Sequence, residues 1–393
     1  MNKNKAKFIA IPFLTLVFGL FFINIIDADK ESSSSENRSL KQKPIKKDIV
    51  DSTYASEYEA YYSDQFAFRE SFSKFYTELE VALGKNKVKS YYLLDDNWIM
   101  PTPTKIIEDN EIKDIANDVN KLAKIGTKTN KEVYYVSTPH KENALAHLYK
   151  KGTKGVGNAS KNKNNLKDNI DKENIKFIDI DDYFLKQFNE EELEDLYFKT
   201  DHHWNGIGAF EGFKYIIEEM NILDNPSWEN YITKNLDKGY FLGSYNKNLN
   251  KAVNEDESIP YVYLKDKPEY KYFKYNGKDE VEIKEKDCVA TSINKDEILY
   301  GGAYMFGDVC SILKIRNEKA LVDKKIIIFR DSYQAPTSWL FADIFSEVQL
   351  VDPRHVESID MSCSEILENS DADIAMFMYD TTDFKELIGE MKK

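Results

Sequence analysis

Short apolar, β-branched runs alternate with segments of helical periodicity, and this alternation constrains the fold of the 393-residue chain most strongly. The run Lys325–Phe329, which reads KIIIF, is typical of a strand buried on both faces of a sheet. The expected strands are 132–138, 175–180, 326–329, 347–351 and 374–378, and the expected helices are 106–128, 166–173, 190–197, 205–220, 335–345 and 358–367. Such alternation predicts an α/β fold, with a mostly parallel sheet and helices on both faces.

One region interrupts this alternation. Residues 239–323 contain polar turns and short aromatic alternations such as Tyr261-Val262-Tyr263, which predict a meander of β-strands. We expect a β-rich insertion that carries part of a substrate groove. The insertion lies within a single expected domain, residues 51–393.

The N-terminus carries a long apolar run from Phe8 to Ile26, preceded by Lys3, Lys5 and Lys7. These 19 residues are enough to span a bilayer core of about 30 Å, and the lysines mark its cytoplasmic side. We therefore expect residues 1–29 to be a cytoplasmic stub and a single-pass membrane anchor, with the bulk of the chain outside the cytoplasm. A cleaved signal peptide is the alternative, and the poor cleavage site after the run favours the anchor. The serine- and lysine-rich residues 30–50 predict a flexible linker.

The net charge of -14 argues against nucleic acid as a partner, because nucleic-acid-binding proteins carry a basic surface. An acidic protein also tolerates a neutral or basic glycan better than a strongly anionic one. The three cysteines, Cys288, Cys310 and Cys363, are too few for a disulfide framework and lack zinc-site spacing. Buried free thiols are favoured, and a Cys288–Cys310 bridge is the alternative.

The stretch Thr200–Trp204, TDHHW, concentrates an aspartate and two of the five histidines of the chain. In an extended backbone, residues i and i+2 point to the same side, so Asp201 and His203 face one way and His202 and Trp204 the other. An aspartate beside a histidine fixes the imidazole tautomer and stabilises its charged form, which is the base half of a hydrolytic triad. A packed or solvated pair of loop histidines is the alternative.

A candidate nucleophile follows the strand expected at 326–329. The chain continues as Arg330-Asp331-Ser332-Tyr333, so Ser332 stands at the carboxyl end of a strand, where open α/β sheets place their sites. A surface serine in a turn or a helix cap is the alternative. If the two motifs form one site, the Ser332 hydroxyl lies within hydrogen-bond reach of His203.

The order Asp-x-His-Trp, then strand-Asp-Ser-Tyr, then Val351-Asp352-Pro353-Arg354 resembles the bacterial DHHW protein family. It is also similar to the SGNH-hydrolase-like domains of alginate O-acetylation proteins. The resemblance covers roughly residues 50–393 and implies an SGNH-hydrolase-like, flavodoxin-like fold. Carried over by motif, it implies a catalytic triad of Ser332, His203 and Asp201.

Four further residues are candidates for substrate binding. Arg330 stands where the ordinary Gly-Asp-Ser motif has glycine, and the backbone N–H of Ser332 or of Tyr333 is the expected donor to an oxyanion. His140 follows the strand 132–138 and either lines the pocket or is an exposed loop histidine. Asn246 is either an amide donor to a sugar or a turn residue.

The resemblance implies an extracytoplasmic enzyme that O-acetylates a secreted or cell-wall polysaccharide. It also implies an acetyl donor relayed by a multi-spanning membrane acyltransferase. A carbohydrate acetylesterase with the same triad is one alternative, and a non-catalytic glycan-binding or assembly subunit is another. No metal is expected, because the histidines lack the H-E-x-x-H spacing, and no cofactor is needed.

Overall fold

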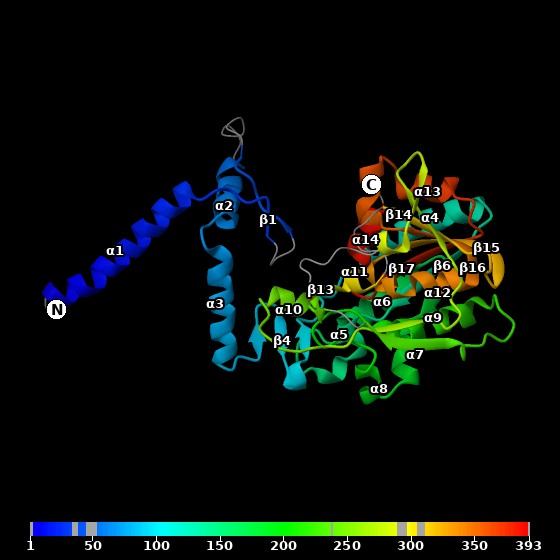
Figure 1. Ribbon diagram of the computed structural model, residues 1–393, viewed down its shortest axis with the longest axis horizontal. Coiled ribbons are helices and arrows are strands. Elements are labelled where there is room, and N and C mark those ends of the chain that lie inside the picture. The colour runs from blue at the N-terminus through cyan, green and yellow to red at the C-terminus, as the bar shows by residue number, and fades with distance from the viewer. Residues whose placement is uncertain are drawn as a thin grey trace. The chain divides into compact units, whose positions relative to one another are not determined.

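The computed structural model describes residues 3–33, 38–44, 53–236, 239–288, 297–304 and 311–391 (Figure 1). Contacts divide the chain into two compact units. The first unit contains residues 1–89 and 246–252, and the second contains residues 90–245 and 253–393. Part of the expected linker, 34–37 and 45–50, lies outside the described residues.

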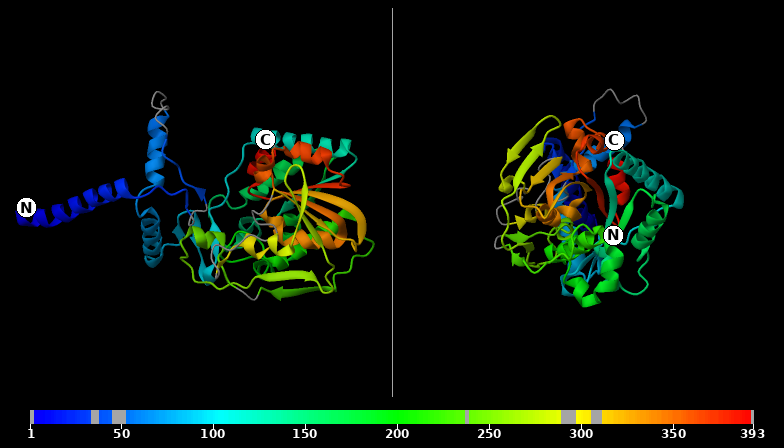
Figure 2. Two further views of the ribbon diagram at one scale, coloured as in Figure 1. Left: turned by 45° about the horizontal axis from the view of Figure 1, so that its top comes forward. Right: turned by 90° about the vertical axis from the view of Figure 1, so that its right-hand side faces the viewer.

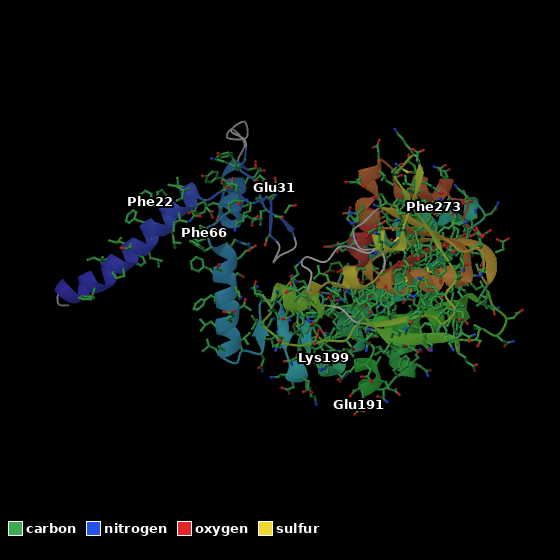
Figure 3. The ribbon with its side chains drawn as sticks, viewed as in Figure 1. Phe22, Glu31, Phe66, Glu191, Lys199 and Phe273 are labelled. Atoms are coloured by element: carbon green, nitrogen blue, oxygen red, sulfur yellow. The ribbon has the colours of Figure 1, made fainter. Side chains whose placement is uncertain are left out.

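The first unit is built mainly from helices. Its elements are α1 (Lys3–Ile26), β1 (Ser32–Ser33), β2 (Arg38–Ser39), α2 (Tyr54–Asp64), α3 (Arg69–Ala82) and β3 (Lys87–Val88). The apolar run at 8–26 is helical, and its side chains, such as Phe22, are exposed (Figure 3). Within the part of the chain that the structure describes, no helix is both long enough and apolar enough to cross a membrane, which differs from the transmembrane helix expected there.

The second unit is a mixed α/β domain around an eight-stranded sheet with the order β12-β11-β14-β16-β15-β17-β6-β7. The strands from β16 to β7 are mutually parallel, and β14, β11 and β12 extend the sheet in antiparallel fashion. The strands are β6 (Glu132–Thr138), β7 (Lys176–Asp179), β11 (Lys271–Tyr275), β12 (Glu280–Ile283), β14 (Ile312–Arg316), β15 (Val322–Arg330), β16 (Phe345–Val351) and β17 (Ile374–Asp380).

Helices cover both faces of this sheet (Figure 2). Ile326 and Ile328 of β15 join one apolar core with Phe213 and Phe341, whereas Ile327 and Phe329 join the other core. This alternation follows from the two-residue period of a strand, and burial on both faces explains the continuous apolar run. The helices are α4 (Asp109–Lys128), α5 (Lys141–Ala144), α6 (Asn158–Asn169), α7 (Ile180–Gln187), α8 (Glu190–Glu194), α9 (Gly206–Met220), α10 (Ser244–Asn248), α11 (Tyr300–Ala303), α12 (Ser338–Ile344), α13 (Cys363–Asn369) and α14 (Phe384–Glu390).

The expected strands of the alternating region are all present, with shifts of a few residues at their ends. The expected insertion at 239–323 is only partly separate, because its strands β11, β12 and β14 belong to the main sheet. The smaller pairs are β4 (Tyr91–Leu93) with β5 (Ile99–Pro101), β8 (Tyr231–Asn235) with β10 (Pro260–Leu264), and β9 (Tyr240–Phe241) with β13 (Glu297–Ile298). Cys288 and Cys363 are buried, and Cys310 lies outside the described residues, so the alternative disulfide is not tested.

Candidate active site

The structure brings Ser332, His203 and Asp201 together at the carboxyl edge of the parallel strands. Ser332 begins a short 3₁₀ segment, Ser332–Thr337, directly after β15. Asp331 caps this segment, because its carboxylate accepts hydrogen bonds from the N–H groups of Tyr333, at 2.8 Å, and Asp380, at 2.7 Å. The same carboxylate therefore holds the end of β15 against the end of β17, and this fixes the position of Ser332.

The three side chains form a hydrogen-bonded chain. The distance from Ser332 Oγ to His203 Nε2 is 2.6 Å, and the distance from His203 Nδ1 to Asp201 Oδ1 is also 2.6 Å. Asp201 and His203 therefore lie against each other as the sequence predicted, although the backbone that carries them bends and is not extended. An imidazole oriented by a carboxylate can accept the proton of the serine hydroxyl.

Asp201 is buried and held as an anion. Its Oδ1 accepts from the His203 N–H at 3.0 Å, and its Oδ2 accepts from the Ser244 N–H at 2.6 Å. Burial raises the pKa of Asp201, but the neighbouring imidazoles and these hydrogen bonds outweigh it, so the pKa lies well below its ordinary value. An ionised Asp201 can stabilise the imidazolium that forms when His203 takes a proton.

Tyr300 of α11 stacks on the candidate base. Its ring lies 3.6 Å from the His203 ring between centroids, with an interplanar angle of 5°. The stacked ring restricts rotation of the imidazole and offers a π-face to the imidazolium. Sequence reasoning missed Tyr300, because its only signal is a position inside the 239–323 region that was expected to shape the site.

A buried lysine supports the loop that carries Asp201. Lys141, the first residue of α5, is fully buried, and its ammonium donates to the carbonyls of Ile99 at 2.9 Å, Lys199 at 2.6 Å and Asp201 at 3.0 Å. Glu257 accepts from the N–H groups of Lys199 and Thr200 on the same loop. Burial lowers the pKa of Lys141 to about 7, whereas the negative charges of Glu257 and Asp201 act to raise it. We call Lys141 with the three carbonyls that it binds the lysine clamp. Sequence reasoning missed it, because its residues are far apart in the chain.

Two of the predicted substrate-binding residues are structural instead. Arg330 is only 2% exposed, and its guanidinium pairs with Asp352 at 3.4 Å and donates to the Asp331 carbonyl at 3.1 Å. Tyr333 is also buried, and its N–H is already bonded to Asp331. Both predictions therefore fail for the same reason: the groups are used inside the protein and do not face a substrate.

The two histidines that flank the triad lie differently from expectation. Residues 200–203 form a bend, so His202 does not point away from Ser332 but lines the same pocket. His140 is buried, which excludes an exposed loop histidine, and its Nδ1 accepts from the Glu142 N–H at 3.1 Å. Burial, followed by the nearby His203 and Lys141, lowers the pKa of His140 to about 3. His140 therefore caps α5 as a neutral imidazole.

Asn246 lies in α10, and its contacts group it with the first unit. The residue is fully buried, and its contact with a sugar stays a prediction.

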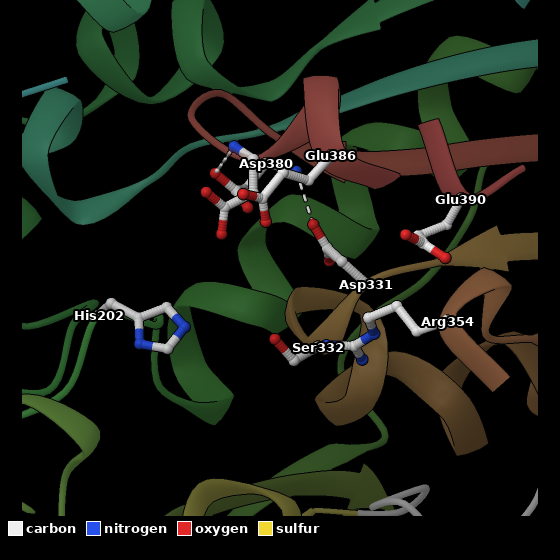
Figure 4. Close-up of a pocket in the computed structure, with 8 residues that line it drawn as sticks. His202, Asp331, Ser332, Arg354, Asp380, Glu386 and Glu390 are labelled. Atoms are coloured by element: carbon white, nitrogen blue, oxygen red, sulfur yellow. Dashed lines mark hydrogen bonds between the residues drawn. The ribbon is translucent and has the colours of Figure 1, made fainter. Parts of the chain in front are cut away.

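A solvent-accessible pocket of about 610 Å³ opens onto Ser332 (Figure 4). The residues that line it are His202, Asp331, Ser332, Arg354, Asp380, Asp383, Glu386 and Glu390. Ser332 thus faces a cavity large enough for a small ligand. Most of the acidic side chains come from the C-terminal residues 380–390, which sequence reasoning did not connect with the site.

Two clusters place potential metal-ligating atoms close together. In the first, Asp201, His202 and His203, both ring nitrogens of His203 are already engaged, and His202 Nδ1 lies 2.8 Å from Ser244 Oγ. In the second, Asp179, Asp181 and Asp182, each carboxylate already pairs with the ammonium of Lys163, at 2.8 to 3.0 Å. A lysine thus supplies the positive charge that a cation would bring to the second cluster.

Comparison with solved structures identifies the fold. Bacillus cereus PatB1, solved with a sulfonyl adduct, matches with a TM-score of 0.67 and 21% identity, over 78% of this chain and 100% of PatB1. A DHHW family protein from Eubacterium siraeum matches with a TM-score of 0.60 and 19% identity, over 78% of this chain and 96% of that protein. The chain has the DHHW-protein fold. The resemblance to DHHW proteins that the sequence predicted is therefore confirmed at the level of the fold.

The O-acetyltransferase domain of Pseudomonas putida AlgJ is a more distant structural match. Its TM-score is 0.42 and its identity 8%, over 77% of this chain and 98% of that domain. No protein-family model matches the sequence, and no curated protein matches it significantly.

Proposed function

We propose that this chain is a serine acyl-ester enzyme that O-acetylates a polysaccharide outside the cytoplasm. The observation that carries the proposal is the hydrogen-bonded chain from Ser332 through His203 to Asp201, which ends at an accessible pocket. The choice of an acetyl group and a polysaccharide rests on the resemblance to DHHW and alginate O-acetylation proteins. The sulfonyl adduct on PatB1 supports an accessible nucleophile in this fold, since sulfonyl reagents modify activated hydroxyl groups.

The first half-reaction forms an acyl-serine. Ser332 Oγ attacks the acyl carbon of the donor ester while His203 Nε2 takes the hydroxyl proton. The bond from the acyl carbon to the donor oxygen then breaks, and His203 returns the proton to the departing alcohol. We assign the Ser332 N–H to the developing oxyanion, because this group has no hydrogen-bond partner among the described residues.

The second half-reaction determines whether the enzyme transfers or hydrolyses. A sugar hydroxyl attacks the acyl-serine, His203 takes the hydroxyl proton, and the proton returns to Ser332 Oγ as the new ester leaves. Water in place of the sugar gives a carbohydrate acetylesterase instead. For transfer, the donor is an acetyl group presented by a multi-spanning membrane acyltransferase, and the acceptor must exclude water from the acyl-serine.

Mass spectrometry of oligosaccharides incubated with the full-length protein and an activated acetyl ester tests this proposal. We expect the oligosaccharide to gain the mass of acetyl groups with wild-type protein but not with Ser332→Ala. Consumption of an acetylated oligosaccharide, with no gain by the unacetylated one, would assign the protein as an esterase. If neither reaction occurs and a sulfonyl fluoride does not label Ser332, the non-catalytic glycan-binding alternative holds.

A further inference from the structure

The pocket beside Ser332 is strongly acidic. Five of its eight lining side chains are carboxylates, and one, Arg354, is a permanent cation. Figure 4 shows the carboxylates of Asp331, Asp380, Glu386 and Glu390 around the same space as Ser332. The acidic wall is therefore part of the cavity that a substrate must enter to reach the nucleophile.

The acidic groups are linked directly to the nucleophile. Asp331 precedes Ser332 in the chain, and its Oδ2 lies 2.7 Å from the Asp380 N–H. Asp380 Oδ1 in turn accepts from the N–H of Asp383 at 3.2 Å. These contacts run from Ser332 to the start of α14, which contributes Glu386 and Glu390 to the wall.

Arg354 is the cation among these lining residues, and it is shared with Asp352, with Nε at 2.9 Å from Oδ1 and Nη2 at 2.6 Å from Oδ2. Burial lowers the pKa of His202, so its imidazole stays neutral at pH 7. Burial and then the Asp380 charge raise the pKa of Asp331, and the Asp380 charge and then burial raise the pKa of Asp383 to about 7. These shifts favour the neutral carboxyl in the free protein, and a cation bound beside the two groups would favour their charged form.

We propose that the pocket recognises a primary ammonium group that the substrate carries close to the reacting ester or hydroxyl. This proposal rests on the proposed function of Ser332 and names the substrate class for that site. A primary ammonium fits better than a quaternary one, because the described residues of the lining include carboxylate acceptors and no Phe, Tyr or Trp ring for an aromatic cage. A polyuronate is disfavoured, because its carboxylates would be repelled by the wall.

Two substrate components can supply this group, and matched compounds separate them. If the acceptor supplies it, a glucosamine oligosaccharide should accept acetyl groups at least about tenfold better, in kcat/KM, than the N-acetylated oligosaccharide of equal length. If the acyl donor supplies it, the p-nitrophenyl ester of alanine should acylate Ser332 at least about tenfold faster than p-nitrophenyl acetate, after correction for its faster uncatalysed hydrolysis. In either case the preference should fall as the ionic strength rises from about 0.01 M to 1 M.

Side chains at the mouth of the pocket provide the matched variants. Asp383 and Glu386 are exposed, so Asp383→Asn with Glu386→Gln changes charge with little change in packing. This double variant should lower the ratio of kcat/KM for the cationic substrate over its neutral analogue by about tenfold. Glu368→Gln, at an exposed position of α13 outside the pocket, is the control and should leave the ratio unchanged.

Binding to Ser332→Ala separates failure of this proposal from failure of the proposed function. Calorimetric titration of this variant with the glucosamine oligosaccharide or with alanine amide, each against its N-acetyl analogue, measures recognition without turnover. Preference for the amine supports the ammonium site even if no catalysis is found. Equal use of the amine and its neutral analogue by the active protein, together with equal binding, overturns the ammonium site and leaves the triad intact.

Discussion

Replacing Lys141 with methionine keeps the approximate length of the side chain but removes the ammonium that holds three backbone carbonyls. The lost hydrogen bonds reach Ile99 at 2.9 Å, Lys199 at 2.6 Å and Asp201 at 3.0 Å. Each buried carbonyl left without a partner costs about 1–3 kcal/mol, and the relief of burying a charge offsets part of that cost. We therefore expect the free energy of unfolding to fall by about 3–5 kcal/mol.

The same substitution should slow the chemistry of Ser332. The Asp201 carbonyl that Lys141 holds belongs to the residue whose carboxylate orients His203. A displacement on the order of 1 Å in a supporting loop can lower a rate by about 100-fold. We expect a loss of this size in the rate at which a sulfonyl fluoride labels Ser332, measured well below the unfolding transition.

Urea unfolding followed by tryptophan fluorescence, together with labelling measured by mass spectrometry, provides the assay. Trp98 reports on the clamp directly, because its ring centroid lies 4.8 Å from the Lys141 ammonium. Lys151→Met removes a charge from an exposed position and should change neither measurement. If Lys141→Met unfolds within about 1 kcal/mol of wild type and labels at the wild-type rate, the clamp does not position the site.

Three further outcomes test the remaining arguments. Asp201→Asn should lower kcat by about 10⁴-fold, because an amide no longer fixes the tautomer of His203. Since the pKa of Asp201 lies below its ordinary value, the stability that its charge contributes should be complete above about pH 4 and should disappear as the pH falls further. Urea unfolding of the wild type and the variant at a series of acidic pH values would detect this loss. Tyr300→Leu should lower kcat more than it changes KM, since it removes the ring stacked on His203, and an equal loss in KM would instead indicate a substrate contact. Native protein should stay with the membrane fraction after a high-salt wash if residues 1–29 are an anchor, whereas release with a new N-terminus near Asp27 would identify a signal peptide.

The parts of the site that were predictable from the sequence depend on local geometry. The run KIIIF in β15 predicted a strand buried on both faces, and helices do cover both faces of that strand. Ser332 follows the strand at the edge of the sheet where sites form. The contact of Asp201 with His203 was predicted from an extended backbone, and it forms although these residues bend. The same assumption gave the wrong direction for His202, which lines the pocket of Ser332.

The parts that were not predictable depend on contacts between distant segments. Lys141 lies 60 residues before Asp201 in the chain, and Tyr300 stacks on His203 from another region. Arg330, which stands where the ordinary Gly-Asp-Ser motif has glycine, was predicted to bind substrate, but its pairing with Asp352 depends on the register of two neighbouring strands. A single sequence carries no signal for such contacts.

The two motifs that identify the site also brace each other. Trp204 of the D-H-H-W stretch donates its indole N–H to the Tyr333 carbonyl at 2.8 Å, and the Tyr333 hydroxyl donates to the His202 carbonyl at 2.6 Å. These bonds join the loop that carries His203 to the loop that carries Ser332. Because the Ser332–His203 hydrogen bond tolerates little displacement, residues that set the distance between the loops help to maintain its geometry. This explains why the tryptophan and the tyrosine accompany the acid, base and nucleophile in the two motifs, although neither side chain faces the pocket.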